Sequence, residues 1–231
     1  IVGAEPVKAL VGAGLMLLFT GFIWTGQRGK GPAVDEVIQV AVGYANLTTG
    51  DFRMDPANPP LAKELSALPL LGLGLRAPPF EPFGPEAWRL FRRGQDFLHF
   101  FPPAAAGGEK ADRILARARL APLILALAMA GVAWAWGGLA ALALVAGCPT
   151  LVAFGGIATT DLPLAAFWLA TLWLWKRHLE SPSRGRAVAA GAALGAAMAT
   201  KFTGDLLVPV LAAAFWVDRG GPPSGRPRVV W

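Results

Sequence analysis

The chain has 231 residues, of which 55% are hydrophobic and only 16% are charged, and its mean hydropathy is +0.49. Soluble domains carry about 25% charged residues, so this composition excludes a disordered chain and disfavours a soluble domain. The net charge of +6 does not indicate nucleic-acid binding, because the basic residues are scattered between apolar runs and form no stripe or basic helix. The one cysteine, Cys148, allows no disulfide within the chain.

Uncharged runs predict an all-α fold, a polytopic bundle of transmembrane helices. A helix needs about 20 apolar residues to cross a bilayer. The first such run is 9–27, for which a cleavable signal peptide is the alternative. Residues 120–160 carry no charge and are long enough for two helices with a turn at Gly137-Gly138. The expected spans are 9–27, 114–136, 139–157, 162–176, 187–201 and 204–217.

Residues 28–112 differ from the rest of the chain. They hold 10 of the 15 carboxylates and many prolines, and no run there is apolar enough to cross a membrane. We expect a large extracytoplasmic loop with short amphipathic helices at about 35–49, 59–75 and 85–100. The second of these helices would lie on the membrane surface.

The distribution of basic residues predicts the orientation. The positive-inside rule places residues 176–186 and the basic segment 218–231 in the cytoplasm. Counting back through the spans puts Asp161 and the 28–112 loop outside. The count closes only if 187–217 crosses twice, as two short helices that meet near Lys201. Because the chain lacks an initiator Met and stops after a polar segment, we expect it to be a fragment of a longer protein.

Two carboxylate positions stand out against the apolar background, and carboxylates near membrane depth are functional candidates. Asp35 and Glu36 are adjacent, so they cannot share a helix face and would play different roles; the alternative is an acidic pair that complements the helix dipole. Asp161 lies in Thr159-Thr160-Asp161, where the Asp or a Thr could instead cap a helix that begins near Pro163.

Basic residues near the outer ends of the spans are candidates for holding a phosphate. Arg113 and Arg117 share a helix face and Arg119 points elsewhere; the alternative for all three is snorkelling to lipid headgroups. Lys63 on the surface helix could meet the same phosphate. Lys201 and Asp205 are four residues apart and could simply neutralise each other.

Several common sites are missing from the sequence. His99 and His178 have no neighbouring ligands at metal spacing, so no zinc site is predicted. There is no P-loop, GxSxG or dinucleotide-binding glycine pattern.

The polar motifs follow one another in the order of a known family. In the first loop these are Asp35-Glu36, Gly43-Tyr44, Thr49-Gly50-Asp51-Phe52-Arg53, Asn58-Pro59-Pro60-Leu61-Ala62-Lys63 and Leu68-Pro69-Leu70. Downstream they are Ala111-Asp112-Arg113, Ala118-Arg119-Leu120, Ala158-Thr159-Thr160-Asp161 and Thr200-Lys201-Phe202-Thr203. The ordered set resembles polytopic glycosyltransferases of the protein O-mannosyltransferase and aminoarabinose transferase type, which have the glycosyltransferase C fold.

The resemblance implies an inverting transfer of a sugar from a polyprenyl-phosphate carrier to a protein or glycolipid acceptor. It implies a bacterial cytoplasmic membrane location, with the active site facing outward. Asp35 would be the catalytic base, with Glu36 beside it binding the acceptor or supporting the base. The site for the substrate and the carrier phosphate would comprise Lys63, Arg117, Arg119, Asp161 and Lys201, with Arg119 also holding the loop and Asp161 lining the same cavity. The resemblance requires no cofactor and leaves a divalent cation open.

Gln39 and Asn58 depart from the family pattern, because many relatives have His at both positions. If those His residues contact substrate, Gln39 and Asn58 would do so as neutral groups. Two other classes of function remain open. The chain could be a transporter or flippase that uses Asp161, Lys201 and Asp205 as a relay, although no internal repeat is visible. It could also be a non-catalytic membrane subunit that binds a partner through the 28–112 loop.

Overall fold

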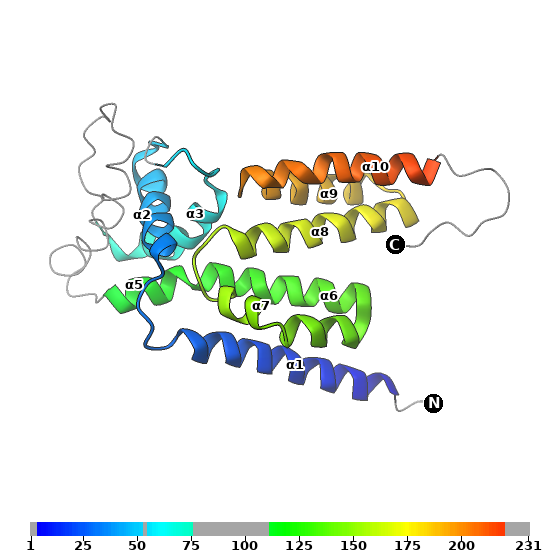
Figure 1. Cartoon of the computed structure of the whole chain (residues 1–231), viewed down its shortest axis with the longest axis horizontal. Helices are drawn as coiled ribbons and strands as arrows, with labels where there is room; N and C mark the ends of the chain where they lie inside the picture. The colour runs from blue at the N-terminus through cyan, green and yellow to red at the C-terminus, as the bar shows by residue number, and fades with distance from the viewer. Residues whose placement is uncertain (1–3, 53–54, 76–110, 220–231) are drawn as a thin grey trace.

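The computed structural model of the chain describes residues 4–52, 55–75 and 111–219 (Figure 1). These residues form helices and connecting turns with no strand among them, which confirms the all-α prediction. In chain order the elements are α1 (Ala4–Gln27), α2 (Val34–Thr49), α3 (Leu61–Ala67), η1 (Leu68–Leu73), α5 (Ala111–Ala118), α6 (Leu120–Ala146), α7 (Pro149–Phe154), α8 (Asp161–Glu180), α9 (Arg184–Met198), η2 (Phe202–Leu206) and α10 (Leu207–Arg219).

The long helices form a bundle in which α6 reverses direction part of the way along. Gly138 has φ 67° and ψ −159°, a conformation that is open essentially only to glycine. Ala126 and Ala130 before the reversal therefore lie in the same core cluster as Leu142 and Ala146 after it. The turn predicted at Gly137-Gly138 is confirmed, and Figure 1 shows the two halves of α6 side by side.

The core of the bundle is apolar, and so is its outer surface. Phe19 and Ile23 of α1 are buried in a core cluster that also holds residues of α6 and α8. Large apolar side chains also face outward, including Leu17, Leu144 and Trp216, which are 74%, 76% and 81% exposed. Leaving such a side chain in water forgoes about 1.5–3 kcal/mol, so this surface suits lipid better than water.

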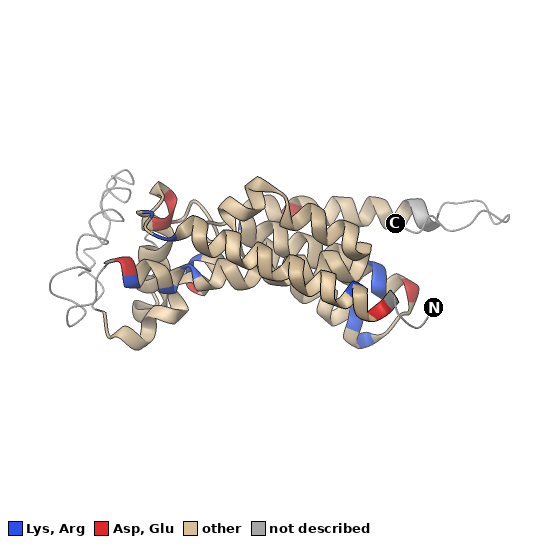
Figure 2. Ribbon diagram, turned by 90° about the horizontal axis from the view of Figure 1, so that it is seen from below, with Lys and Arg blue, Asp and Glu red and all other residues tan. Residues whose placement is uncertain are grey.

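Lys, Arg, Asp and Glu gather mainly at the two ends of the bundle, with a largely uncharged stretch between them (Figure 2). Two described segments are long and apolar enough to cross a membrane, Glu5–Gln27 and Asp112–Ala146, the second of which includes the reversal at Gly138. Phe202–Trp216 is a shorter apolar stretch. The chain is an all-α membrane helical protein, while the six spans and their orientation stay predictions.

A small helical unit, here called the cap, sits on one end of the bundle and comprises α2, α3, η1 and α5 (Figure 1). Its core includes Val40 and Tyr44 of α2, Leu70 of η1 and Ile114 of α5. The predicted helix 35–49 is confirmed as α2. The predicted helix 59–75 begins as α3 and tightens into the 3₁₀ helix η1 around Pro69. The predicted helix 85–100 lies outside the described residues.

Gly43 is what allows α2 and α3 to cross closely. A Cβ atom at Gly43 would lie 2.0 Å from the carbonyl oxygen of Lys63, so only glycine fits.

Residues 187–217 form two helices, α9 and α10, which are separated by the turn residues 199–201 and by η2. This agrees with the expectation of two short helices meeting near Lys201.

Candidate active site

A buried ion pair joins the cap to the bundle. Glu36, which is fully buried, accepts hydrogen bonds from Arg119 Nε at 2.8 Å and from Arg119 Nη2 at 2.7 Å. The backbone N–H groups of Ala33 and Ala158 donate to the same carboxylate at 3.0 and 2.9 Å. Four donors therefore surround one carboxylate, and they come from three segments that are distant in the sequence.

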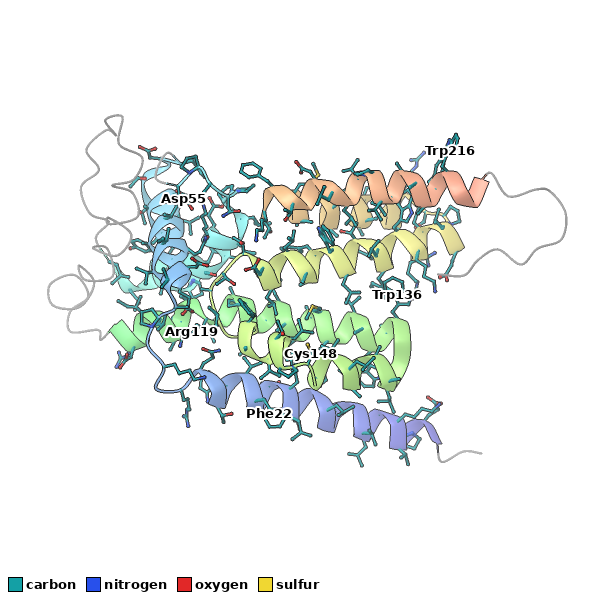
Figure 3. The ribbon with its side chains drawn as sticks, in the orientation of Figure 1. Phe22, Asp55, Arg119, Trp136, Cys148 and Trp216 are labelled. Carbon is teal, nitrogen blue, oxygen red and sulfur yellow. The ribbon has the colours of Figure 1, made fainter. Side chains whose placement is uncertain are left out.

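Arg119 uses its whole guanidinium group inside the protein, at the junction of the cap and the bundle (Figure 3). Besides Glu36, it donates to the carbonyl oxygens of Gln27 and Lys30 at 3.3 Å and of Gly31 at 3.1 Å. These bonds account for all five N–H donors of an arginine. The predicted role of Arg119 in holding the loop agrees with this geometry. The predicted contact with a carrier phosphate does not, because no donor is left for a phosphate.

The N-terminus of α2 explains why the two adjacent carboxylates differ. Glu36 folds back to accept the N–H of Ala33, the residue before the helix, and so caps the first turn. It is therefore buried and bonded at both oxygens, a geometry that favours the supporting role expected of Glu36 over direct binding of the acceptor, and its part in catalysis stays a prediction. Asp35 lies on another face of the same turn, is exposed, and has no hydrogen bond or ion pair to any residue the structure describes.

Lys63 is the second predicted phosphate ligand whose N–H donors are already bonded to other groups of the protein. Its ammonium group, only 1% exposed, contacts Asp55 Oδ2 at 2.7 Å and donates to the carbonyl oxygens of Asp55 and Asn58 at 2.8 Å. Burial lowers the pKa of Lys63, and its bond and charge interaction with Asp55 act against that shift. The three N–H donors of the lysine hold the 55–58 turn, so Lys63 has none for a carrier phosphate.

Asp161 and Lys201 come together across two helix ends. Lys201 Nζ donates to Asp161 Oδ1 at 2.7 Å, and the two side chains are 32% and 53% exposed. Lys201 is extended, with φ −155° and ψ 142°, because it precedes η2 rather than lying in a helix. The expected neutralisation of Lys201 by Asp205 is therefore wrong, since its partner is Asp161.

The expected helix cap before Pro163 is also absent. Helix α8 begins at Asp161, and the preceding Thr160 is in a helical conformation and makes no side-chain cap bond. Thr159 is buried, and its hydroxyl oxygen has no hydrogen-bond partner among the described residues; the same is true of Gln39 Oε1. Both residues stand in or beside polar motifs of the sequence, but their unsatisfied polar atoms could not be predicted from it, because hydrogen-bond partners depend on packing.

Backbone contacts show that several predicted site segments meet at the cap end of the bundle. The N–H of Ala158 donates to Glu36, the residue that follows Asp35. The N–H of Leu61 donates at 3.0 Å to the carbonyl oxygen of Ala199, which is two residues before Lys201. Arg117 is half-buried and has no partner within the described residues. The geometry thus separates structural ions, namely Glu36, Arg119 and Lys63, from ionisable groups that remain accessible, namely Asp35, Arg117, Asp161 and Lys201.

A metal site is not apparent in the described part of the chain. No three His, Cys, Asp or Glu side chains gather there closely enough to hold an ion. His178 lies near the far end of α8, and His99 lies outside the described residues.

The comparison with protein families bears on the second half of the chain. Residues 113–222 match the family model of dolichyl-phosphate-mannose-protein mannosyltransferases. The matched segment contains Arg117, Arg119, Asp161 and Lys201, whereas Asp35, Glu36 and Lys63 precede it. No curated protein and no solved structure gives a significant match. The family match supports the resemblance seen in the sequence: residues 113–222, slightly less than half of the chain, are similar to the dolichyl-phosphate-mannose-protein mannosyltransferase family, and this similarity supports a membrane glycosyltransferase of the mannosyltransferase type.

Proposed function

We propose that this protein transfers a sugar from a polyprenyl-phosphate carrier to an acceptor hydroxyl at the outer face of a bacterial cytoplasmic membrane. The observation that carries the proposal is the contrast between the two adjacent carboxylates. Glu36 is buried and held by four N–H donors, while Asp35 beside it is exposed and unpaired among the described residues. A fixed helix end that presents one accessible carboxylate meets the positional requirement for a general base.

The chemistry is a single displacement with inversion. Asp35 takes the proton of the acceptor hydroxyl while its oxygen attacks the anomeric carbon of the sugar. The bond from that carbon to the phosphate oxygen breaks, and its electron pair leaves with the polyprenyl phosphate. The balance is complete: a glycoside forms, the carrier phosphate is released and Asp35 holds the proton.

Negative charge grows on the departing phosphate, so a cation close to it would stabilise the transition state. Since the donors of Arg119 and Lys63 are already engaged, this role passes to Lys201 and Arg117. Lys201 donates one hydrogen bond to Asp161 and is one-third exposed, so its two other N–H donors stay available for a phosphate. Asp161 would then orient the ammonium group rather than bind the phosphate itself.

The test uses the full chain in proteoliposomes that contain polyprenyl-phosphate-linked mannose labelled in the sugar, with an acceptor Ser/Thr peptide or an envelope glycolipid. Asp35→Asn should lower the transfer rate at least about a hundredfold, the low end of general-base effects, without changing thermal stability. Asp205→Asn, which alters another exposed carboxylate, should transfer at the normal rate. Normal transfer by Asp35→Asn would exclude Asp35 as the base.

The same assay separates the remaining alternatives. A transporter would move labelled lipid or sugar across the bilayer without forming a covalent product, and a non-catalytic subunit would do neither. Adding a chelator to the reaction decides whether a divalent cation takes part.

A further inference from the structure

A cavity of about 270 Å³ lies where the end of α1 meets the junction of α5 and α6, and none of the residues assigned to sugar transfer is among those that line it. One wall is apolar and consists of Ile23, Trp24, Leu115, Leu120 and Leu123. The polar side chains at the cavity are Arg28 and Lys30 on the loop after α1, and Asp112 on α5. Gln27 and Arg119 also line it, but the amide of Gln27 donates to Ala153 and Arg119 is fully engaged.

The two basic side chains are carried by a loop whose backbone is fixed. Arg119 binds the carbonyls of Gln27, Lys30 and Gly31, so the loop wraps around a buried guanidinium group. Gly29 has φ 69°, a left-handed conformation that makes the tight turn possible. The guanidinium group of Arg28 also lies 5.7 Å from the centre of the Trp24 ring, within cation–π range. The backbone that carries both cations and the side chain of Arg28 are therefore held in place before any ligand arrives.

The composition of the cavity selects the chemical class of ligand. Arg28 and Lys30 oppose the single carboxylate of Asp112, which leaves one net positive charge. An apolar wall next to a basic rim, at the end of a helix apolar enough to cross a membrane, fits a phosphate with a hydrocarbon chain. Trp24 is half-exposed at this position, as is typical of aromatic residues at a membrane interface.

We propose that this cavity binds the phosphate of an anionic bilayer phospholipid, with Arg28 and Lys30 on the phosphate and the first part of an acyl chain on the apolar wall. A sugar-bearing carrier fits less well, because Ile23, Leu115, Leu120 and Leu123, which form most of the apolar wall, offer no polar group to the hydroxyl groups of a sugar. The inference depends on insertion in a membrane and not on the proposed transfer reaction.

The test measures lipid binding by native mass spectrometry of the full chain in mild detergent. Phosphatidylglycerol, phosphatidylcholine and a polyprenyl phosphate are titrated separately and in competition. We expect phosphatidylglycerol to bind about tenfold more tightly than phosphatidylcholine. The double variant Arg28→Gln/Lys30→Gln should bind phosphatidylglycerol about tenfold more weakly. The matched double variant Lys8→Gln/Arg184→Gln removes two exposed cations elsewhere and should bind as the unmodified chain does.

A second variant separates cavity binding from general surface attraction. Ala116 lines the cavity and is exposed, so Ala116→Trp fills it without changing its charge, and Ala116→Leu does so if the larger side chain prevents folding. Either substitution should abolish phosphatidylglycerol binding. Equal losses in the two double variants, retained binding in the filled cavity, or equal binding of the two phospholipids would overturn the proposal. Displacement of phosphatidylglycerol by an equal amount of polyprenyl phosphate would overturn it in favour of the carrier.

Discussion

The buried pair between Glu36 and Arg119 yields the sharpest stability prediction. Arg119→Met removes five N–H donors and leaves the fully buried carboxylate of Glu36 with only the two backbone donors of Ala33 and Ala158. It also leaves the carbonyl oxygens of three loop residues, Gln27, Lys30 and Gly31, without this partner. Removing one member of a buried ion pair costs about 3–5 kcal/mol, so we expect a loss of that size in the free energy of unfolding.

A double-mutant cycle tests the physical reason for that loss. Glu36→Leu alone leaves the arginine charge uncompensated, whereas Arg119→Met/Glu36→Leu removes both charges. The double variant should therefore be destabilised by at least about 2 kcal/mol less than the sum of the single variants. Arg119→Lys keeps the charge but offers three donors in place of five, and should fall between the unmodified chain and Arg119→Met.

Unfolding in detergent, followed by the fluorescence of the nine tryptophans, provides the measurement. Arg117→Met is the matched control, because Arg117 lies two residues away and has no partner within the described residues. Its effect should stay within about 0.5 kcal/mol. The reasoning is refuted if Arg119→Met costs no more than Arg117→Met, or if the effects in the cycle simply add.

Three further predictions rest on other contacts. Gly43→Ala should destabilise the protein by about 1–3 kcal/mol, since the new Cβ would press on the carbonyl of Lys63; Gly14→Ala, where the added atom meets open space, is its control in the same unfolding assay. Lys63→Met should cost about 3 kcal/mol by leaving Asp55 unpaired, and a smaller cost than that of a surface substitution would contradict the buried pair. Burial lowers the pKa of Lys63 in the folded protein below 10.5, its value in the unfolded chain. Between these two pKa values the unfolded chain binds more protons than the folded one, so the stability of the protein rises with pH up to about 10.5. Lys63→Met should remove this rise. Asp161→Asn should change stability by less than about 1 kcal/mol, because the pair with Lys201 is exposed, yet slow sugar transfer at least about tenfold; a rate equal to that of Glu180→Gln would remove Asp161 from the site.

Local features that were predictable from the sequence are those set by a residue and its near neighbours. Apolar runs predicted the helices that became α1, α6 and α8, and the glycine pair predicted the reversal at Gly138, since only glycine readily adopts its backbone angles. The prediction of a helix at 35–49 also succeeded, because this helix too is set by residues that are near neighbours in the chain. Register and helix type at 59–75 were less predictable, because Pro69 and packing on α2 decide where α3 tightens into η1.

The sequence by itself determined that this protein is an all-α membrane helical protein and which polar motifs it carries, because composition, periodicity and motif order are properties of the chain. Only the tertiary structure decided what the ionisable groups do. Arg117 and Arg119 are two residues apart and look alike in the sequence, yet one has no partner among the described residues and the other makes five bonds to groups 83 to 92 residues away. The physical reason is that most of these acceptors are backbone carbonyls, which every residue has, and their positions are set by how the cap packs on the bundle. The same packing buries Glu36 and leaves Asp35 exposed.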